Sequence, residues 1–415
     1  MKLPFGDGTI DVSFPDCAVT VAEPAGGEPV DPREAGTQAL DEPHGPPLSA
    51  RASPGDEVAL VVTDITRATP DDVLVDLLLD ELRGNGVNRS AITIVIGLGL
   101  HRPLTEAEIA DLLGTHADLA INHDPDAVVE VGQVDGVPVE IHPAVAEADL
   151  VVSTGMVEPH QYAGFSGGAK TVVVGAGGEA LIRHTHGPEL LGREGVRLGG
   201  TDRNPFREFL DRAGDLAGPE FCLNVTHGPS GILDVAAGDP RAVVADLAGS
   251  AREALSVPVE GTYDAVVAGV SAPKDANLYQ ASRAATYVAL GDHDPLARPD
   301  GPANGGGRIV VPAELPEGAG QGTGERRFHD RLAAAADAAT LYEEMKAGYE
   351  PGAQRAFIVA RVLRTHDVYI TNSTHPEVVQ ECLMIACDSV QDAVEPGSDV
   401  LVVPDALNTL LVAAG

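Results

Sequence analysis

Residues 58–84 read VALVVTDITRATPDDVLVDLLLDELRG, and this stretch decides the fold class of the chain. Its first six residues are apolar and mostly β-branched, which predicts a buried strand ended by the polar residues 64–67. Thr69 as N-cap, Pro70 in the first turn and two acids facing the helix dipole then predict a helix. Apolar residues continue at helical spacing to Gly84, where we expect the helix to stop.

The same unit repeats further along the chain. Residues 91–96 predict a second strand, 97–103 a loop, and the capping box Thr105–Glu108 a helix that ends at Gly114. A third strand near residues 150–153 leads into a polar segment. This alternation predicts a mainly parallel α/β sheet, in which ligands bind at the carboxyl ends of strands. We therefore expect the three polar loops that follow these strands to meet at one site, with Arg67, His101 and His160.

A chain of 415 residues is too long for one ordinary core, so we predict two α/β domains with the active site in the cleft between them. The predicted domains are residues 1–258 and 259–415. The first 50 residues are expected to form short strands and loops. Whether the last dozen residues return to the first domain is left open. The second domain is expected to contain the following elements: strands at 263–270, 308–311, 368–371 and 400–403, helices from 278 and over 354–363, and a loop at 301–307.

The charge balance excludes some classes of protein. The chain has 63 Asp and Glu against 27 Lys and Arg, a formal net charge of −36, and no basic stripe for nucleic acid. Such self-repulsion is tolerable where salt screens it, so we expect a salt-adapted protein, with an acidic mesophilic protein as the alternative. No apolar run approaches the roughly 18 residues that cross a bilayer, and no signal sequence is evident, so we expect a cytoplasmic location. Oligomeric state has no indication in the sequence.

The cysteines and one glycine-rich segment are possible sites for a metal, a disulfide or a phosphate group. Cys382 and Cys387 lie in an apolar context that favours helix and packing over a disulfide or zinc. Residues 164–171, GFSGGAKT, come within one residue of a phosphate-binding loop. However, the valines that follow favour a strand and turn, whereas the lysine of such a loop must open a helix. We therefore reject a nucleotide triphosphatase, although the glycines still allow a ligand to approach the backbone closely.

Lys170 is unusual because it is one of only four lysines and lies inside this glycine-rich loop. It is either a chance surface lysine or a nucleophilic amine that could carry a covalent group. His160, His184 and His186 flank it. A neutral imidazole is a common general base and a common ligand of nickel, copper or zinc, although each histidine taken alone is more often an ordinary polar residue.

Four motifs together resemble the nickel-pincer lactate racemase family, over residues 58 to 415. They are DITR at 64–67, GLHRP at 99–103, PHQYAGFSGGAK at 159–170 followed by His186, and NLYQ at 277–280. In order and at the family's spacing they are specific, whereas one alone would be weak. The resemblance implies a racemase that interconverts the D and L enantiomers of a 2-hydroxy acid, with lactate favoured.

The resemblance also implies roles for individual residues. Lys170 would tether a pyridinium bis-thio mononucleotide covalently, and His186 would be the protein ligand to its Ni²⁺. His101 and His160 would be the acid/base pair, and Arg67 would orient the substrate carboxylate. The remaining implied positions line cofactor or substrate: Asp64, Thr66, Ser166, Gly167, Gly168 and Tyr279 for the cofactor, Gln280 and Arg283 for the substrate.

This assignment is chemically coherent. Removal of hydride from the substrate carbon, while a base takes the hydroxyl proton, forms a flat 2-keto acid, and hydride return to its other face inverts the centre. Two faces require two bases, and an arginine fork holds the carboxylate. Beyond the hydroxy acid, the implied partners are the enzymes that assemble the cofactor.

Two departures from the family bear on the substrate. Arg283 stands where lactate-type members have lysine, and the chain has no tryptophan where they carry one, near Gln354 and Arg355. Both changes are compatible with lactate, with a bulkier hydroxy acid, or with one that has a second carboxylate. Two rival functions are a protein that only binds or stores the nickel nucleotide, and a zinc hydrolase using His184 and His186. The first needs no histidine pair, and the second lacks a third ligand at the usual spacing.

Overall fold

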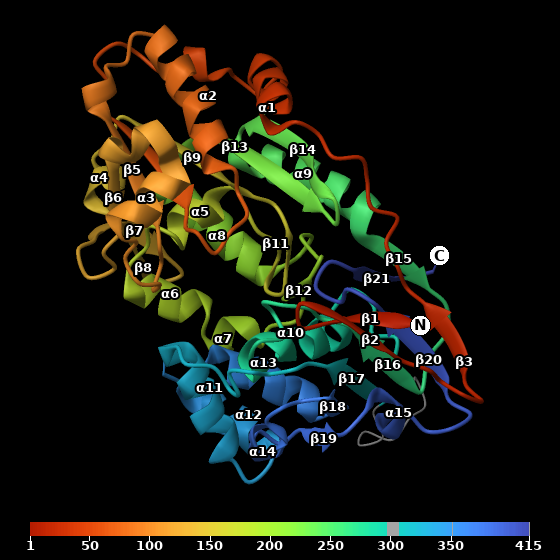
Figure 1. The fold of residues 1–415 in the computed structure, drawn as a ribbon. Helices are drawn as coiled ribbons and strands as arrows, with labels where there is room; N and C mark the ends of the chain where they lie inside the picture. The colour runs from red at the N-terminus through yellow and green to blue at the C-terminus, as the bar shows by residue number, and fades with distance from the viewer. Residues whose placement is uncertain (297–306, 351, 415) are drawn as a thin grey trace.

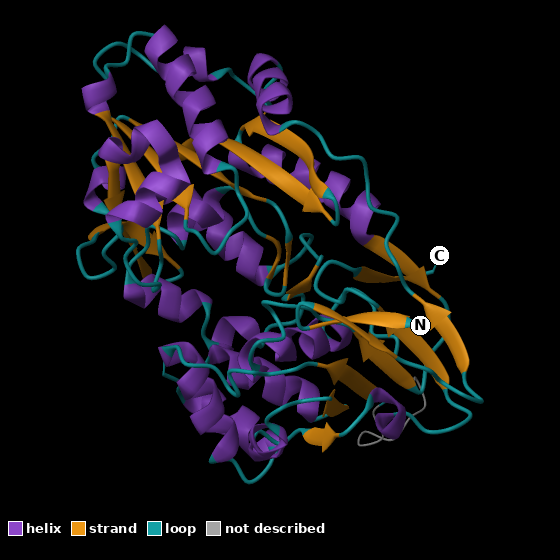
Figure 2. Cartoon of the chain, in the orientation of Figure 1, coloured by secondary structure: helices purple, strands orange, loops and turns teal. Residues whose placement is uncertain are grey.

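A computed structural model describes residues 1–296, 307–350 and 352–414, and it places two six-stranded sheets in separate lobes (Figure 1). The first lobe is built on the sheet that contains the strand predicted at residues 58–63. The second lobe is built on the sheet of the C-terminal part of the chain. Helices lie against both sheets (Figure 2). The predicted class, α/β with mainly parallel sheets, is confirmed.

The first sheet has the strand order β14-β13-β9-β4-β5-β6 and is parallel except for the β13–β14 pair. Its central strands are buried on both faces, and every residue of β9 is buried. Parallel strands covered on both faces need continuous apolar runs, which explains why residues 58–62 do not alternate with polar residues. The strands are β4 (Val58–Thr63), β5 (Ile92–Gly97), β6 (Ala120–Asn122), β9 (Leu150–Met156), β13 (Pro219–Gly228) and β14 (Gly231–Gly238).

Nine α-helices belong to the described part of the first lobe. They are α1 (Pro32–Asp41), α2 (Asp71–Gly84), α3 (Glu106–Leu113), α4 (Pro143–Ala146), α5 (Ala169–Val173), α6 (Glu179–Thr185), α7 (Pro188–Leu191), α8 (Pro205–Ala217) and α9 (Pro240–Leu255). Helix α3 begins with the predicted capping box: the Thr105 hydroxyl accepts from the Glu108 amide, and the Glu108 carboxylate accepts from the Thr105 amide. Helix α7 packs against α12 (Ala338–Ala347) and α13 (Gln354–Leu363) of the second lobe, so the lobes are in contact there.

The second sheet is parallel throughout, in the order β19-β18-β17-β16-β20-β3. Its strands are β3 (Ala18–Val21), β16 (Ala265–Ala268), β17 (Arg308–Pro312), β18 (Asp367–Thr371), β19 (Ile385–Cys387) and β20 (Asp399–Val403). Its helices are α10 (Leu278–Ala289), α11 (Thr323–Ala333), α12 (Ala338–Ala347), α13 (Gln354–Leu363), α14 (Pro376–Glu381) and α15 (Val390–Ala393). The strands and helices predicted here are present, and most of the predicted loop at 301–307 falls outside the described residues.

Smaller sheets complete the described chain. They are the hairpins β1–β2 (Lys2–Phe5, Gly8–Asp11) and β7–β8 (Val129–Val134, Val137–Ile141), the sheet β10-β11-β12 (Pro159–His160, Ala163–Phe165, Arg197–Leu198) and the pair β15–β21 (Ser256–Val259, Leu410–Ala413). In the last pair, β21 lies parallel to β15, the strand that spans the predicted domain boundary between residues 258 and 259. No helix in the described ranges combines the length and apolar character needed to cross a membrane.

The N-terminal segment differs from the prediction in two ways. Strand β3 pairs with β20 of the second sheet, so the prediction that residues 1–258 form one domain is wrong at its start (Figure 1). These two strands are about 380 residues apart in the sequence, so no local sequence pattern could predict that they pair. The segment then crosses to the first lobe and forms α1, which was also not predicted. Asp31 caps this helix and Pro32 is its first residue, which together are a typical helix start. The helix was not predicted because the first 50 residues were interpreted from their overall composition as short strands and loops.

Three local predictions are corrected. Thr69 does not cap α2; Pro70 occupies that position without a side-chain bond, and Asp71 is buried, accepting from the hydroxyls of Thr63 and Thr154. The residues after Lys170 form the short helix α5 rather than a strand, because their valines are buried in the lobe's core. Cys382 follows a helix and is buried, but Cys387 lies in β19; all four cysteines are free.

A comparison of Gly164, in the 159–170 motif, with Gly218, at the end of α8, tests how tightly that motif is packed. A Cβ at Gly164, whose φ is +75°, would lie 2.1 Å from the carbonyl oxygen of Gly200, whereas one at Gly218, with φ +71°, would meet nothing within 4 Å. Gly218→Ala should cost about 1–2 kcal/mol for the left-handed backbone alone. Gly164→Ala should cost more than about 3 kcal/mol because backbone must move. Urea unfolding of the two variants measures this difference, and equal losses would contradict the packing described.

Candidate active site

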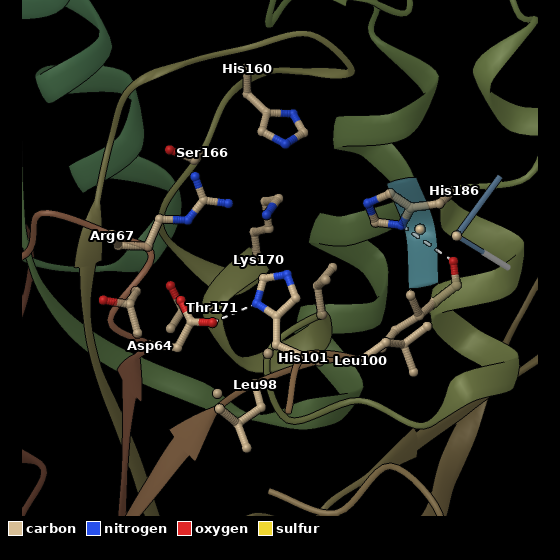
Figure 3. Close-up of a pocket in the computed structure, with 18 of the residues that line it drawn as sticks. Asp64, Arg67, Leu98, Leu100, His101, His160, Ser166, Lys170, Thr171 and His186 are labelled. Carbon is tan, nitrogen blue, oxygen red and sulfur yellow. Dashed lines mark hydrogen bonds and ion pairs between the residues drawn. The ribbon is translucent and has the colours of Figure 1, made fainter. Parts of the chain in front are cut away.

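A cavity of about 580 Å³ lies at the carboxyl ends of the central strands of the first lobe and reaches the second lobe. Its first-lobe wall includes Asp64, Arg67 and His101 from the loops after β4 and β5. From the second lobe, Tyr279 of α10, Arg327 of α11 and Gln354 of α13 contribute. Figure 3 shows the side chains of His101, His160, Lys170 and His186 directed into this cavity. The three loops predicted to converge after parallel strands therefore do so.

Asp64 and His101 form a hydrogen-bonded pair at the cavity wall. The Nδ1 of His101 lies 2.5 Å from Oδ2 of Asp64, whose other oxygen accepts from the amide and hydroxyl of Thr66. Burial alone would raise the pKa of Asp64, but the bonds from His101 and Thr66 outweigh it and lower that pKa. An ionised carboxylate at Nδ1 holds the proton there and leaves Nε2 of His101 as a free acceptor.

His160 has the opposite hydrogen-bond arrangement. Its Nδ1 accepts from the backbone amides of Tyr162 and Ala163, at 3.3 and 3.2 Å. The rings of Tyr162 and Phe206 lie against it. Burial, together with the charges of Lys170 and Arg67, lowers the pKa of His160 well below its ordinary value. The ring is therefore neutral with its proton on Nε2, so it presents a donor where His101 presents an acceptor.

Lys170 is the second residue of α5 and lines the cavity with no carboxylate bonded to it among the described residues. Burial, with the charges of Arg67 and Arg207, lowers the pKa of its amine to about 7. A substantial fraction of the amine is therefore neutral, and nucleophilic, at neutral pH. Because the amides of Gly168, Lys170 and Thr171 are already bonded to Asn224, Gly167 and Gly168, the loop does not offer a phosphate cradle.

His186 follows α6 and faces the same cavity. Its Nδ1 lies 3.0 Å from the Thr185 hydroxyl and 3.3 Å from the Ile182 carbonyl oxygen, so Nδ1 carries the proton and Nε2 is free. A carbonyl holding one imidazole nitrogen is the usual arrangement around a metal-binding histidine. Burial and the charge of Lys170 lower the pKa of His186 to about 4, which keeps the ring neutral.

Within the described ranges no group of three or more His, Cys, Asp and Glu side chains is placed to hold a metal ion. His184, which the zinc hydrolase hypothesis paired with His186, lies in a different surface pocket with Asp135 and Arg212. That hypothesis therefore fails on geometry. A metal ion bound at His186 would need most of its ligands from a cofactor.

Arg67 makes a contact that the sequence did not reveal. Its Nη1 donates to Oε1 of Glu158 at 2.6 Å, and both side chains are about one-third exposed. The backbone amide of Glu158 also donates to the Ser166 hydroxyl, and this bond joins the start of the segment that follows β9 to residues further along it. In the sequence, the only indication that Glu158 belongs to the site is its position directly before the 159–170 motif. The substrate arginine implied by the resemblance is thus already paired.

The other implied residues divide into two groups. Ser166, Gly167 and Tyr279 line the cavity, whereas Thr66, Gly168, Gln280 and Arg283 lie beside it without lining it. Gly168 is pressed against the first turn of α9, where a Cβ would lie 2.8 Å from the Pro240 carbonyl oxygen. Arg283 donates to the Tyr287 hydroxyl at 2.9 Å.

The lowered pKa of Lys170 predicts a specific pH dependence. Acetylation of its amine by acetic anhydride should rise through pH 7 as the amine loses its proton, not near the ordinary lysine value of about 10.4. Peptide mass spectrometry across pH 6–10 measures the midpoint for this residue. Because the Glu158 carboxylate raises the pKa of Lys170, Glu158→Gln should move that midpoint further down. A midpoint near 10 would contradict the burial of this amine.

Comparisons with known proteins agree on one family. Residues 5–199 match the lactate racemase N-terminal domain. The chain is 26% identical over 395 residues to the lactate racemase of Lactiplantibacillus plantarum, covering 90% of this chain and 89% of that protein. It is 27% identical over 438 residues to the lactate racemase of Thermoanaerobacterium thermosaccharolyticum, covering 99% of each.

Two solved structures share the fold. The lactate racemase apoprotein of Thermoanaerobacterium thermosaccharolyticum superposes with a TM-score of 0.84 at 24% identity, over 99% of both chains. A protein of Thermotoga maritima superposes with a TM-score of 0.65 at 16% identity, covering 94% of this chain and 100% of that one. Residues 5–199 therefore belong to the lactate racemase N-terminal domain family, and the chain is similar over at least 90% of its length to two lactate racemases.

Proposed function

We propose that this protein is a racemase that interconverts the D and L enantiomers of a 2-hydroxy acid. Lactate, the substrate in the names of its relatives, is proposed to be one of its substrates. The observation that carries the proposal is the pair of histidines with opposite hydrogen-bond arrangements that face one cavity beside a buried amine. A protein that only stored a cofactor would need no such pair, so the carrier hypothesis explains less.

The residues present fit the nickel-pincer nucleotide implied by the family resemblance. Lys170 would hold it through a neutral amine, and His186 would offer Nε2 to the nickel. The absence of a cluster of metal ligands in the described chain is compatible with an ion that is chelated mainly by an organic group. When bound, the nucleotide would supply the acceptor for the hydride of the substrate carbon.

The protein's own side chains supply proton transfer and orientation. The hydroxyl proton of one enantiomer moves to the free Nε2 of His101, and the Asp64 carboxylate stabilises the imidazolium that forms. His160 donates its Nε2–H to the same oxygen as it becomes a carbonyl. To act as a base toward the opposite enantiomer, His160 must give up the bonds that its Nδ1 accepts from the Tyr162 and Ala163 amides. The two histidines are thus inequivalent.

The cofactor assignment is tested by intact mass. Protein co-expressed with the cofactor-assembly enzymes should carry an adduct that is absent in Lys170→Ala, because the attached amine is gone. Lys346→Ala is the matched control, since Lys346 lies on the surface beside Glu343. His186→Ala should keep the adduct and lose nickel, measured by elemental analysis. An unmodified Lys170 in active protein would overturn the assignment.

The proton-transfer assignment is tested by Asp64→Asn. The variant should lower kcat about 10²–10⁴-fold, because an amide cannot hold the Nδ1 proton and stabilise the imidazolium. A chiral assay on lactate at high salt measures it. Asp76→Asn is the control. Asp76 also contacts a histidine, since its Oδ1 lies 3.3 Å from Nε2 of His116, but neither residue lines the cavity. Full activity of Asp64→Asn, or of His101→Ala, would refute the role of His101 as base.

A further inference from the structure

Three basic side chains of the second lobe lie close enough together to act on one another electrostatically, behind the residues that line the cavity: Lys274 in the loop after β16, Arg283 of α10 and Arg355 of α13. In a chain with 63 acidic residues, we expect lysine and arginine side chains to form ion pairs with carboxylates. None of the three has an ion pair with any described residue, although most other arginines of the described chain do. Among the described residues, these three cations therefore have no acidic partner in an ion pair, although the protein is strongly acidic.

The burial of Arg355, and of one nitrogen of Arg283, makes this arrangement unusual. Arg355 is 6% exposed, and its Nε and Nη1 are buried with no hydrogen-bond partner among the described residues. Arg283 donates one bond to the Tyr287 hydroxyl, but its Nε is likewise buried and unpartnered. A buried guanidinium without an anion carries a large desolvation cost, which such sites normally offset with a counter-charge.

The cluster adjoins the cavity through Tyr279. The guanidinium of Arg355 lies 4.7 Å from the centre of the Tyr279 ring, which lines the cavity. Glu158 is near enough to Lys274 and Arg283 to affect both electrostatically, but it is bonded to Arg67. One carboxylate therefore interacts with three cations, Arg67, Lys274 and Arg283. Burial together with the charge of Arg283 lowers the pKa of Lys274.

We propose that Lys274, Arg283 and Arg355 form a receptor for substrate carboxylate, and that the preferred substrate is a 2-hydroxy acid with a second carboxylate group. The proposal rests on the racemase function given above. Three unpaired cations exceed the single charge of lactate, and the planar guanidinium matches a carboxylate with two parallel bonds. Lys170 and His186, which are proposed to hold the cofactor and its nickel, lie in the first lobe, and this leaves the cations of the second lobe for the substrate.

Binding to the cofactor-free protein tests this receptor directly. At matched ionic strength, malate should bind at least about tenfold more tightly than lactate, measured by calorimetry and by the shift in Tm. Arg355→Gln should remove most of that preference. Arg364→Gln, on the exposed end of the same helix, should keep it. Equal affinity for malate and lactate would overturn the proposal.

Two further measurements separate the alternatives. If inorganic phosphate, rather than malate, binds through Arg355, the receptor serves a nucleotide phosphate and the proposal is wrong. Because Arg355 has no carboxylate partner among the described residues, Arg355→Gln should leave the unliganded Tm unchanged or raised. A collapse in Tm would show a structural role instead. Arg355→Lys keeps the charge without the fork and should keep part of the preference.

Turnover distinguishes this inference from the function on which it rests. The cofactor-loaded protein should racemise malate with a kcat/KM about tenfold above that for lactate, mainly through KM. Equal kcat/KM values would leave the racemase function intact and overturn the receptor. If no 2-hydroxy acid is racemised, the proposed function fails, and the malate preference of the cofactor-free protein then decides the receptor.

Discussion

The parallel pairing of β4 with β5 and with β9 is the constraint on which the rest of the site depends. Parallel strands end at the same edge, so the segments that follow them must share one space. Asp64, His101 and His160 therefore meet although nearly a hundred residues separate the first from the last. The helices on both faces bury the strands and fix that edge. The chemistry depends on this alignment, since a carboxylate and an imidazole from different loops form one pair.

Burial gives these groups their character, and it acts against the overall charge of the molecule. The chain is strongly acidic, yet the described residues that line the cavity include a lysine, two arginines and three histidines. Desolvation disfavours added positive charge, so the Lys170 amine and the His160 and His186 rings lose protons easily. The result is a set of neutral nitrogen donors beside cations that attract anions. That combination suits a hydroxy acid anion and an electrophilic cofactor.

Much of the architecture could be predicted because its signals are local. The strand at 58–63 and the helices at 106–113 and 354–363 follow from apolar periodicity and capping residues. Failures occurred where tertiary burial overrode propensity. The valines after Lys170 favour a strand, but they fill the core as a helix. Strand β3 joins a partner near the other end of the chain, and no local pattern encodes that.

The sequence by itself determined the α/β class, the polar loops at the strand ends and the motif that holds His160 and Lys170, because these depend on residue type and short-range order. The folded structure was needed to show which nitrogen of each histidine is free and that Glu158 pairs with Arg67. It was also needed to show that Arg283 and Arg355 have buried nitrogens with no hydrogen-bond partner among the described residues. Hydrogen-bond direction and desolvation depend on neighbours brought together by folding. Those neighbours come from distant parts of the chain.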